Sequence, residues 1–450
     1  MMKRYQKYKD SGSKWIEKIP AHWHVKKLKQ LGVFTSSGID KKTNEGEEIV
    51  KMVNYTDIYG NQTGELNRNR DYMVVSCPQE KKIVHKVRKG DLIFTPSSET
   101  VDEIGLSALV DEELPETVYS YHVIRLRFTE SIAHKFKKYL CNNSFVLNQF
   151  SKCAKGTTRQ ILGREDFKNI AVFVSSENEQ EKISFFLDKR TNQIDDLINK
   201  KERMIELLKE ERTAIINHAV TKGLDPDVEM KDSGIEWLGE IPKLWEVKKL
   251  KFNSTVRFSN VDKKSNEGEL DVDLCNYTDV YYNDIITLKL GFMKATASVE
   301  EIRKFQLNIG DTIVTKDSES WDDIAVPAYV VETKDNLLCG YHLAQIKPNT
   351  RVLNGKFLFW MLSGNAFNYQ YKVESSGVTR YGLGNYALSN SFIVLPSIVE
   401  QEKIVAYLDK KTVQIHDQIN LEQKSIELLK EYRTALISEV VTGKIDVRGE

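Results

Sequence analysis

Two stretches of the chain combine regularly spaced apolar residues with an absence of glycine and proline. From residue 178 to residue 221, apolar residues return at two neighbouring positions of a seven-residue period, and the positions between them are mostly Glu, Lys and Arg. Residues 399–450 repeat the pattern, so we expect two long helices, the second followed by a C-terminal tail. The residues of the two apolar stripes are Leu187, Ile194, Ile198, Ile205, Leu208 and Ile215, matched by Leu408, Ile415, Ile419, Ile426, Leu429 and Leu436.

A helix of this length would extend for roughly 60 Å at 1.5 Å per residue, too far for one small globule. Lys201 interrupts the first stripe and Glu422 interrupts the second at the equivalent position. Opposite charges there suit two helices packed against each other, and the pattern predicts an antiparallel coiled coil. Two unrelated core helices inside compact domains are the alternative.

The rest of the chain shows short segments typical of strands. Residues 48–55, 91–95 and 123–128 are β-branched or aromatic and are bounded by Gly, Pro, Asn or Asp. Residues 132–150 are expected to form short helices. The predicted fold class is therefore α+β.

The chain contains one unit twice. KDSG begins at Lys9 and again at Lys231, 222 residues later, and other separated residues return in the same order. We expect a mixed domain at residues 1–177 (head 1), a long helix at 178–221, a second mixed domain at 222–398 (head 2) and the last helix and tail at 399–450, related by a pseudo-twofold repeat. The repeated framework pairs Trp15, Ile19, Pro20 and Trp23 with Trp237, Ile241, Pro242 and Trp245, and it includes Gly90-Asp91 with Gly310-Asp311.

The composition excludes several classes of protein. The 450 residues include 65 Lys and Arg against 65 Asp and Glu, so a histone-like basic coat is excluded. No apolar run approaches the roughly 20 residues that span a bilayer, and the first residues lack the apolar core of a signal peptide. Five cysteines are scattered without CxxC spacing, which argues against a structural zinc site or a disulfide framework. We expect a cytoplasmic protein without a membrane partner.

Two similar heads on a spacer suit the recognition of two half-sites on double-stranded DNA. Because the heads differ in sequence, each would recognise a different short DNA sequence, which we call its word. Donor and aromatic side chains that occur at repeated positions are the candidate DNA contacts. They are Lys41, Lys42, Asn54, Tyr55, Thr56, Tyr121, His122, Lys155, Thr157, Thr158 and Arg159 in head 1, and Lys263, Lys264, Asn276, Tyr277, Thr278, Tyr341, His342, Ser376, Thr379 and Arg380 in head 2.

Each group of candidates has a purely structural alternative. The loops at 155–159 and 376–380 are the first choice, since Gly156 and Gly377 permit a tight turn, but their arginines could instead pair with nearby carboxylates. The paired lysines suit a solvated loop equally well, the NYTD segments suit an Asn–Asp turn, and the tyrosines suit core packing.

No catalytic motif is present. The chain lacks an N-P-P-Y or D-P-P-Y motif, a glycine-rich loop after a strand and a G-x-x-x-x-G-K-[ST] phosphate loop. Asp227, Glu246 and Lys248 imitate a nuclease arrangement, but the position equivalent to Glu246 is His24 in head 1. We therefore expect a protein without catalytic residues and without a metal site.

Several separated motifs occur in the same order in both copies. They are KDSG with its following Trp and Ile-Pro, Gly-Asp before an apolar strand, the Gly-x-Thr-Arg loop, and EQEKI at the start of each long helix. Over essentially the whole chain they resemble the specificity subunit of type I restriction-modification enzymes. The segments TPSSETVDEIG and TKDSESWDDIA depart from that pattern, in which a glycine-bearing loop is more usual.

The resemblance implies two target-recognition domains that each bind one half of a bipartite DNA sequence. It implies that the helices act as a spacer and as a docking surface for two modification (methyltransferase) subunits, which restriction subunits join. S-adenosylmethionine, ATP and Mg²⁺ would belong to those partners, with no cofactor in this chain. The alternative function is a scaffold or adaptor that binds proteins instead of DNA.

Overall fold

The computed structural model describes residues 3–12 and 16–449. Trp15, the counterpart of Trp237 in the repeat, lies outside the described residues. The chain divides into two compact units, Met1–Lys201 with Lys424–Glu450 (unit 1) and Glu202–Gln423 (unit 2). Each unit holds one head and one segment of each long helix, so the division cuts both helices.

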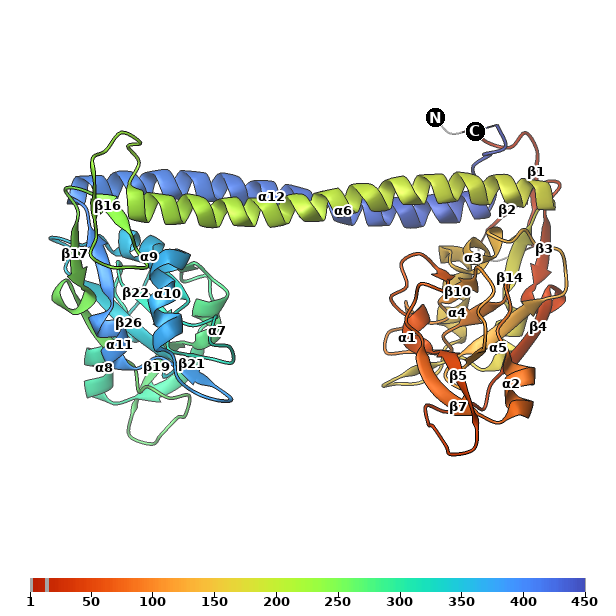
Figure 1. Ribbon diagram of the computed structural model, residues 1–450, viewed down its shortest axis with the longest axis horizontal. Coiled ribbons are helices and arrows are strands. Elements are labelled where there is room, and N and C mark those ends of the chain that lie inside the picture. The colour runs from red at the N-terminus through yellow and green to blue at the C-terminus, as the bar shows by residue number, and fades with distance from the viewer. Residues whose placement is uncertain (1–2, 13–15, 450) are drawn as a thin grey trace. The chain divides into compact units, whose positions relative to one another are not determined.

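The two long helices are α6 (Glu177–Lys222) and α12 (Ile398–Val441). Within each unit they lie side by side and run in opposite directions (Figure 1). Nine of the predicted stripe residues are buried, and Ile215, Ile419 and Leu429 are half-buried. The predicted α+β fold, with two similar heads and a pair of packed antiparallel helices, is confirmed.

Head 1 is built on two sheets that lie close together in sequence and space (Figure 1). The five-stranded sheet has the order β4-β12-β8-β10-β6, and the three-stranded sheet has the order β11-β5-β7. Only the pairs β10–β6 and β11–β5 are parallel in these two sheets. The strands are β4 (Gly32–Ser36), β12 (Ile124–Phe128), β8 (Leu92–Phe94), β10 (Ser107–Val110), β6 (Glu65–Leu66), β11 (Thr117–Tyr119), β5 (Glu48–Val53) and β7 (Met73–Cys77).

Head 2 repeats this topology strand for strand. Its five-stranded sheet has the order β18-β26-β22-β24-β20 and its three-stranded sheet the order β21-β19-β25. The strands are β18 (Ser254–Phe258), β26 (Leu343–Pro348), β22 (Thr312–Thr315), β24 (Pro327–Val330), β20 (Ile285–Ile286), β21 (Met293–Ala297), β19 (Leu270–Cys275) and β25 (Leu337–Cys339). The duplication inferred from sequence is therefore also a duplication of structure.

Three further strand pairs complete each head. One pair brings the beginning of the head next to its end, because β3 (His24–Lys27) pairs with β14 (Ala171–Val174) and β17 (Glu246–Lys249) pairs with β28 (Phe392–Leu395). The other pairs are β1 (Tyr8–Asp10) with β2 (Lys18–Pro20), β9 (Ser97–Ser98) with β13 (Gln160–Ile161), β15 (Met230–Asp232) with β16 (Glu240–Pro242), and β23 (Asp317–Ser318) with β27 (Tyr381–Gly382).

Short helices lie between the strands. In head 1 they are η1 (Leu28–Gln30), α1 (Tyr55–Ile58), α2 (Gln79–His85), α3 (Phe136–Cys141), α4 (Ser144–Cys153) and α5 (Arg164–Asn169). In head 2 they are η2 (Leu250–Phe252), α7 (Tyr277–Tyr281), α8 (Val299–Phe305), α9 (Gly355–Ser363), α10 (Asn365–Glu374) and α11 (Asn385–Asn390). Within the described residues, no helix is both long enough and apolar enough to cross a membrane.

The repeated motifs have structural roles. Gln180 of the first EQEKI segment is buried, accepts the Ala133 N–H at 2.9 Å and donates to the Ser175 carbonyl at 2.8 Å. Gln401 does the same in unit 2, where it accepts the Asn354 N–H at 2.8 Å. A buried amide must find such partners, so each glutamine fixes its head to the start of the long helix that follows.

The Gly-Asp motif is also structural. Asp91 is buried and takes both a 2.8 Å and a 2.7 Å hydrogen bond from the Arg127 guanidinium. Asp311 takes a 2.7 Å bond from the Gln345 amide instead. Trp23 and Trp245 are almost completely buried, and the indole N–H of Trp245 donates to Glu400 at 3.0 Å. These buried residues stabilise the heads.

Candidate nucleic-acid interface

The glycine loop of each head is closed by its own backbone. Lys155 and Ile161 exchange two N–H···O bonds of 3.1 and 2.8 Å, and Ser376 and Gly382 exchange two of 3.1 and 2.9 Å. The strand that closes each loop, β13 or β27, pairs with β9 or β23. Each loop therefore projects from a short two-stranded ribbon.

Both loops require glycine. Gly156 has a φ of +128° and Gly377 a φ of +149°, a region that side chains with a Cβ rarely adopt. A Cβ at either position would lie 2.0 Å from the carbonyl oxygen of the arginine three residues later, Arg159 or Arg380. The tight loop predicted from the sequence is therefore present in both heads.

A pair of stacked tyrosines lies beside the first loop. The Tyr55 and Tyr59 rings are stacked with centroids 5.4 Å apart, and the Arg159 guanidinium lies 5.9 Å from the Tyr55 ring centre. Burial raises the pKa of Tyr55, while the positive charge of Arg159 opposes that shift. The hydroxyl of Tyr59 donates to Glu103 at 2.8 Å. Arginine and an aromatic face thus form one surface in head 1.

Head 2 repeats the arrangement. The Tyr277 and Tyr281 rings are stacked at 5.3 Å, and the charge of Arg380 acts on Tyr277. The hydrogen bond to Asp323 raises the pKa of Tyr281 to about 12. Burial raises the pKa of Tyr277 as well, so both hydroxyls stay protonated and keep their donor capacity at neutral pH.

A histidine joins the surface in head 1. His122 is half-buried, and the Tyr121 ring lies 3.8 Å from its ring. Burial lowers the pKa of His122, and the cations of Lys41 and Arg159 lower it further. The structure therefore brings five sequence-predicted residues of head 1, Lys41, Tyr55, Tyr121, His122 and Arg159, to one surface.

The matching histidine of head 2 has a different partner. His342 Nδ1 lies 2.7 Å from Asp317 Oδ2 and 3.4 Å from Arg380 Nη2. The Tyr341 ring is 5.0 Å from the His342 ring. The amine of Lys316 lies 4.3 Å from the Tyr341 ring centre. The predicted residues Tyr341, His342 and Arg380 thus also lie together.

Two candidates do not belong to this surface. Asn54 is buried and accepts the Tyr55 N–H at 2.8 Å, while the Asp57 carboxylate accepts the Asn54 N–H at 2.7 Å. Asn276 is also buried, and its N–H donates to Asp279 at 2.7 Å. Both asparagines cap a short helix. Their inclusion among the DNA contacts is corrected here, because buried side chains engaged in the cap cannot reach a base.

The remaining candidates are exposed on loops or helix ends. Thr56 and Thr278 are exposed on α1 and α7, and the Lys42 amine lies 3.7 Å from an Asp40 carboxylate oxygen. The rest are also exposed: Lys155, Thr157, Thr158, Lys263, Lys264, Ser376 and Thr379. In the described part of the chain, no ion pair joins Arg159 or Arg380 to a carboxylate, so the alternative of a paired arginine is not observed.

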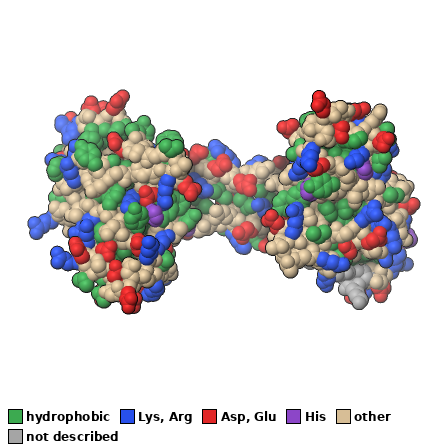
Figure 2. Space-filling model, turned by 90° about the horizontal axis from the view of Figure 1, so that it is seen from below, with side chains coloured by type: hydrophobic (Ala, Val, Ile, Leu, Met, Phe, Trp, Pro, Cys, Tyr) green, Lys and Arg blue, Asp and Glu red, His purple; other side chains and the backbone are tan. Residues whose placement is uncertain are grey.

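Basic side chains do not gather into one patch on the visible face of either head (Figure 2). On the face shown in Figure 2, Lys and Arg side chains are interspersed with Asp, Glu and apolar side chains on each head. This agrees with the zero formal net charge of the chain. Any attraction to DNA must therefore come from local groups such as the arginine loops.

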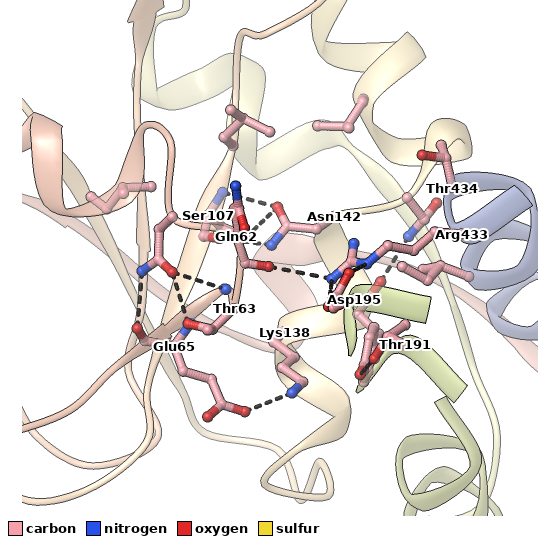
Figure 3. A pocket seen from close by; sticks show the side chains of 18 of the residues that line it. Gln62, Thr63, Glu65, Ser107, Lys138, Asn142, Thr191, Asp195, Arg433 and Thr434 are labelled. Carbon is pink, nitrogen blue, oxygen red and sulfur yellow. Dashed lines mark hydrogen bonds and ion pairs between the residues drawn. The ribbon is translucent and has the colours of Figure 1, made fainter. Parts of the chain in front are cut away.

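A large cavity of about 700 Å³ lies in unit 1, where head 1 meets its segments of α6 and α12 (Figure 3). Lys138 pairs with Glu65 at 2.6 Å and with Asp188 of α6 at 2.7 Å. Arg433 of α12 pairs with Asp195 at 3.0 Å and donates to the Gln62 carbonyl at 3.3 Å. The charges lining the cavity are thus largely paired with one another, and they attach the head to both helices.

Unit 2 has equivalent attachments. Asp409 of α12, the counterpart of Asp188, accepts from Lys356 at 2.6 Å and from the Trp360 indole at 3.1 Å. Arg212 of α6, the counterpart of Arg433, pairs with Asp284 at 2.6 Å. Each head is therefore held by an aspartate from one long helix and an arginine from the other.

The apparent nuclease arrangement is not assembled. The Lys248 amine lies 3.2 Å from Glu246 on strand β17, and the two side chains are 47% and 65% exposed. Among the described residues, no group of three or more His, Cys, Asp or Glu side chains is placed to hold a metal ion.

Sequence reasoning missed several residues of the candidate surface. Tyr59 and Tyr281 complete the stacked pairs, and their recurrence at the offset of 222 could have identified them. Asp317 could not be found in this way, because its counterpart in head 1 is Ser97.

A family model described as "Type I restriction modification DNA specificity domain" matches the chain twice, at residues 20–207 and 242–430. The chain is 23% identical over 459 aligned residues to a putative type I restriction enzyme MjaX specificity subunit of Methanocaldococcus jannaschii, covering 98% of this chain and 99% of the relative. It is 24% identical over 177 residues to the type I restriction enzyme EcoKI specificity subunit of Escherichia coli strain K12, covering 38% and 37% of the two chains.

Solved structures share the fold. One, described as "Structural basis underlying complex assembly and conformational transition of the type I R-M system", matches with a TM-score of 0.73 and 16% identity, over 96% of this chain and 100% of the other. The HsdS subunit from Thermoanaerobacter tengcongensis matches with a TM-score of 0.55 and 16% identity, over 95% and 98%. At this identity the likeness concerns the fold.

Proposed function

Because the chain belongs to the type I restriction-modification DNA specificity family, we propose that it is a non-catalytic subunit that directs partner enzymes to one bipartite DNA sequence. Each head reads one short word of that sequence. The two words differ because the heads differ in sequence. A scaffold that binds only proteins is not favoured by any feature of the two heads.

One observation carries this proposal. In both heads a glycine-dependent loop presents an arginine, and that arginine lies by a tyrosine of a stacked pair. Arginine is the side chain that most often contacts guanine and phosphate, and aromatic rings contact base edges and sugars. The loop arginines have no carboxylate partner within the described residues, so their charge is available to DNA.

The partners follow from the family. We infer that two methyltransferase subunits dock on this chain and that restriction subunits join the complex. S-adenosylmethionine, ATP and Mg²⁺ would then serve the partners, and this chain would supply DNA recognition alone. The two continuous helices, of 46 and 44 residues, suit a spacer between the words.

The direct test is selection from random DNA duplexes by the full chain bound to its methyltransferase partner. The expected result is enrichment of two different short words separated by a fixed gap. Affinity should fall steeply as salt rises, because bound phosphates release counterions. Enrichment without a gapped sequence, or binding that is insensitive to salt, would contradict the proposal.

A further inference from the structure

The two heads differ chemically at one position beside the arginine loop. Asp317 of head 2 begins β23, and Ser97 of head 1 begins the equivalent strand β9. Asp317 Oδ2 lies 2.7 Å from His342 Nδ1. In the described part of head 1, no hydrogen bond joins Ser97 to His122, the counterpart of His342.

The aspartate and histidine lie at the surface that carries the loop. Their side chains are 23% and 28% exposed, so both are held by neighbours and still reach solvent. Arg380 of the loop lies 3.4 Å from the same His342 nitrogen. The pair therefore shares the surface on which we place DNA.

The contact fixes which nitrogen of His342 carries a proton. A carboxylate accepts hydrogen bonds and a guanidinium only donates them, so the short 2.7 Å contact to Asp317 requires a proton on Nδ1. Within the described residues no hydrogen bond engages Nε2 of His342, so this nitrogen is left to accept one from an incoming molecule. Such a fixed orientation is what a base-reading side chain needs, since readout depends on the direction of each hydrogen bond.

The surroundings of the two histidines differ accordingly. His342 is faced by Asp317, by Arg380 and by the Tyr341 ring, against which the Lys316 amine packs. In head 1 the charged groups acting on His122 are Lys41, Arg159 and Asp40. Among the described residues, a carboxylate is hydrogen-bonded to the histidine ring in head 2 and not in head 1.

We propose that Asp317 is a specificity-determining positioning residue of head 2. It orients His342 so that Nε2 meets the edge of a base in the half-site of this head, and Ser97 leaves His122 without that constraint. The proposal rests on the proposed function, because it assumes that the loop surface binds duplex DNA. It explains one way in which two heads with the same glycine-dependent turn, arginine and tyrosine pair can prefer different bases.

The test compares selection from random duplexes by the full chain with its methyltransferase partner and by its D317S and D317N variants. D317S installs the residue of head 1, and its shorter side chain cannot hold the ring. It should reduce the base preference about tenfold or more at one position in one half of the sequence. D317N should retain the preference because its amide oxygen still accepts the Nδ1–H, and the other half should be unchanged in both variants.

A matched variant in head 1 gives the reciprocal result. S97D places a carboxylate beside His122 and should alter the preference at one position of the other half. An unchanged sequence for D317S would overturn the proposal. Equal losses of base preference in D317N and D317S would also overturn it. The negative charge of Asp317, and not the orientation of the His342 ring, would then determine the preference.

A measurement without DNA separates this proposal from the proposed function. Nitrogen-15 NMR of the 8 histidines in the full chain, with H342N for assignment, reports which ring nitrogen carries the proton. Wild type and D317N should show His342 protonated at Nδ1, and D317S should lose that signature. A D317S spectrum identical to wild type would overturn the positioning role. Failure of the wild-type chain to select any gapped sequence would instead overturn the proposed function.

Discussion

The carbonyl oxygen of Arg380 lies where a side chain at Gly377 would have to begin, only 2.0 Å from the position of a Cβ. The loop folds back on itself at this point, and only a residue without a Cβ fits there. The same relationship joins Gly156 to Arg159 in head 1. Two independent loops of one chain thus depend on the same backbone conformation.

Replacing Gly377 with alanine should open the loop. We expect a cost of about 1–3 kcal/mol in local stability from the unfavourable φ, added to a displacement of Arg380. DNA affinity should fall about tenfold or more, since one arginine contact is lost. Binding titrations and thermal unfolding of G377A would measure both. The control is G239A, where φ is +64° and no atom lies within 4 Å of the new Cβ; it should lose stability but not affinity.

Binding by head 1 should take up a proton. Burial and the charges of Lys41 and Arg159 lower the pKa of His122 in the free protein, and phosphates brought close by DNA would raise it. Affinity should therefore increase as the pH falls through the range below about 6.5, the ordinary histidine pKa. DNA-binding titrations designed to run from pH 5.5 to pH 8 should show this increase in affinity for H24N as for wild type. The increase should be absent in H122N.

The lowered pKa of His122 also affects the stability of the free protein. Acidification should favour DNA binding but reduce this stability. A histidine whose folded pKa is depressed stabilises the fold above its unfolded pKa, and that contribution is lost as the pH falls through the folded value. Wild type should thus lose slightly more stability than H122N on acidification. If the free wild-type chain instead gained stability relative to H122N as the pH fell, the lowered pKa of His122 would be contradicted.

Arg433 should hold head 1 on its helices. Its contact to Asp195 is partly buried and its contact to the Gln62 carbonyl is exposed, and their loss in R433A should cost about 1 kcal/mol. Amide exchange in residues 58–65 should accelerate. The control R203A removes an exposed pair with Glu206, 2.7 Å apart in the same helix, and should leave this segment protected. Equal exchange in both variants would show that Arg433 does not anchor the head.

The spacing of the words should follow the length of the helices. Seven residues added to both α6 and α12 keep the phase of the apolar stripe and lengthen each helix by about 10 Å. The selected gap should grow by about three base pairs at 3.4 Å each, or binding should be lost. The sequence selected by this variant is the measurement, and an unchanged gap would contradict the spacer role.

Much of the fold was accessible from the sequence for clear physical reasons. The stripe that includes Leu187 and Leu408 repeats over several heptads without glycine or proline, so both long helices were predicted, and each begins one residue before the predicted start. The glycine loops were found because Gly156 and Gly377 each stand three residues before an arginine. The periodicity of a helix and the residues that favour a tight turn can both be recognised in a single sequence.

Contacts between distant residues left no such signal. Asp317 and His342 are 25 residues apart, and Asp195 and Arg433 are 238 apart. The strands that carry Asp317 and the loop are two residues long, too short for a pattern of alternation. The NYTD segment was misjudged for the opposite reason: its polar letters suggested exposure, but Asn54 is buried by the cap that it forms.

The most direct test of the account exchanges one head for the other. Residues 246–395 are replaced by residues 24–174, since both segments begin and end on strands that pair with each other, β17 with β28 and β3 with β14. Selection from random duplexes by this chain, bound to its methyltransferase partner, should enrich the word of head 1 on both sides of the gap. Recovery of the two different wild-type words would contradict the claim that each head reads its own word.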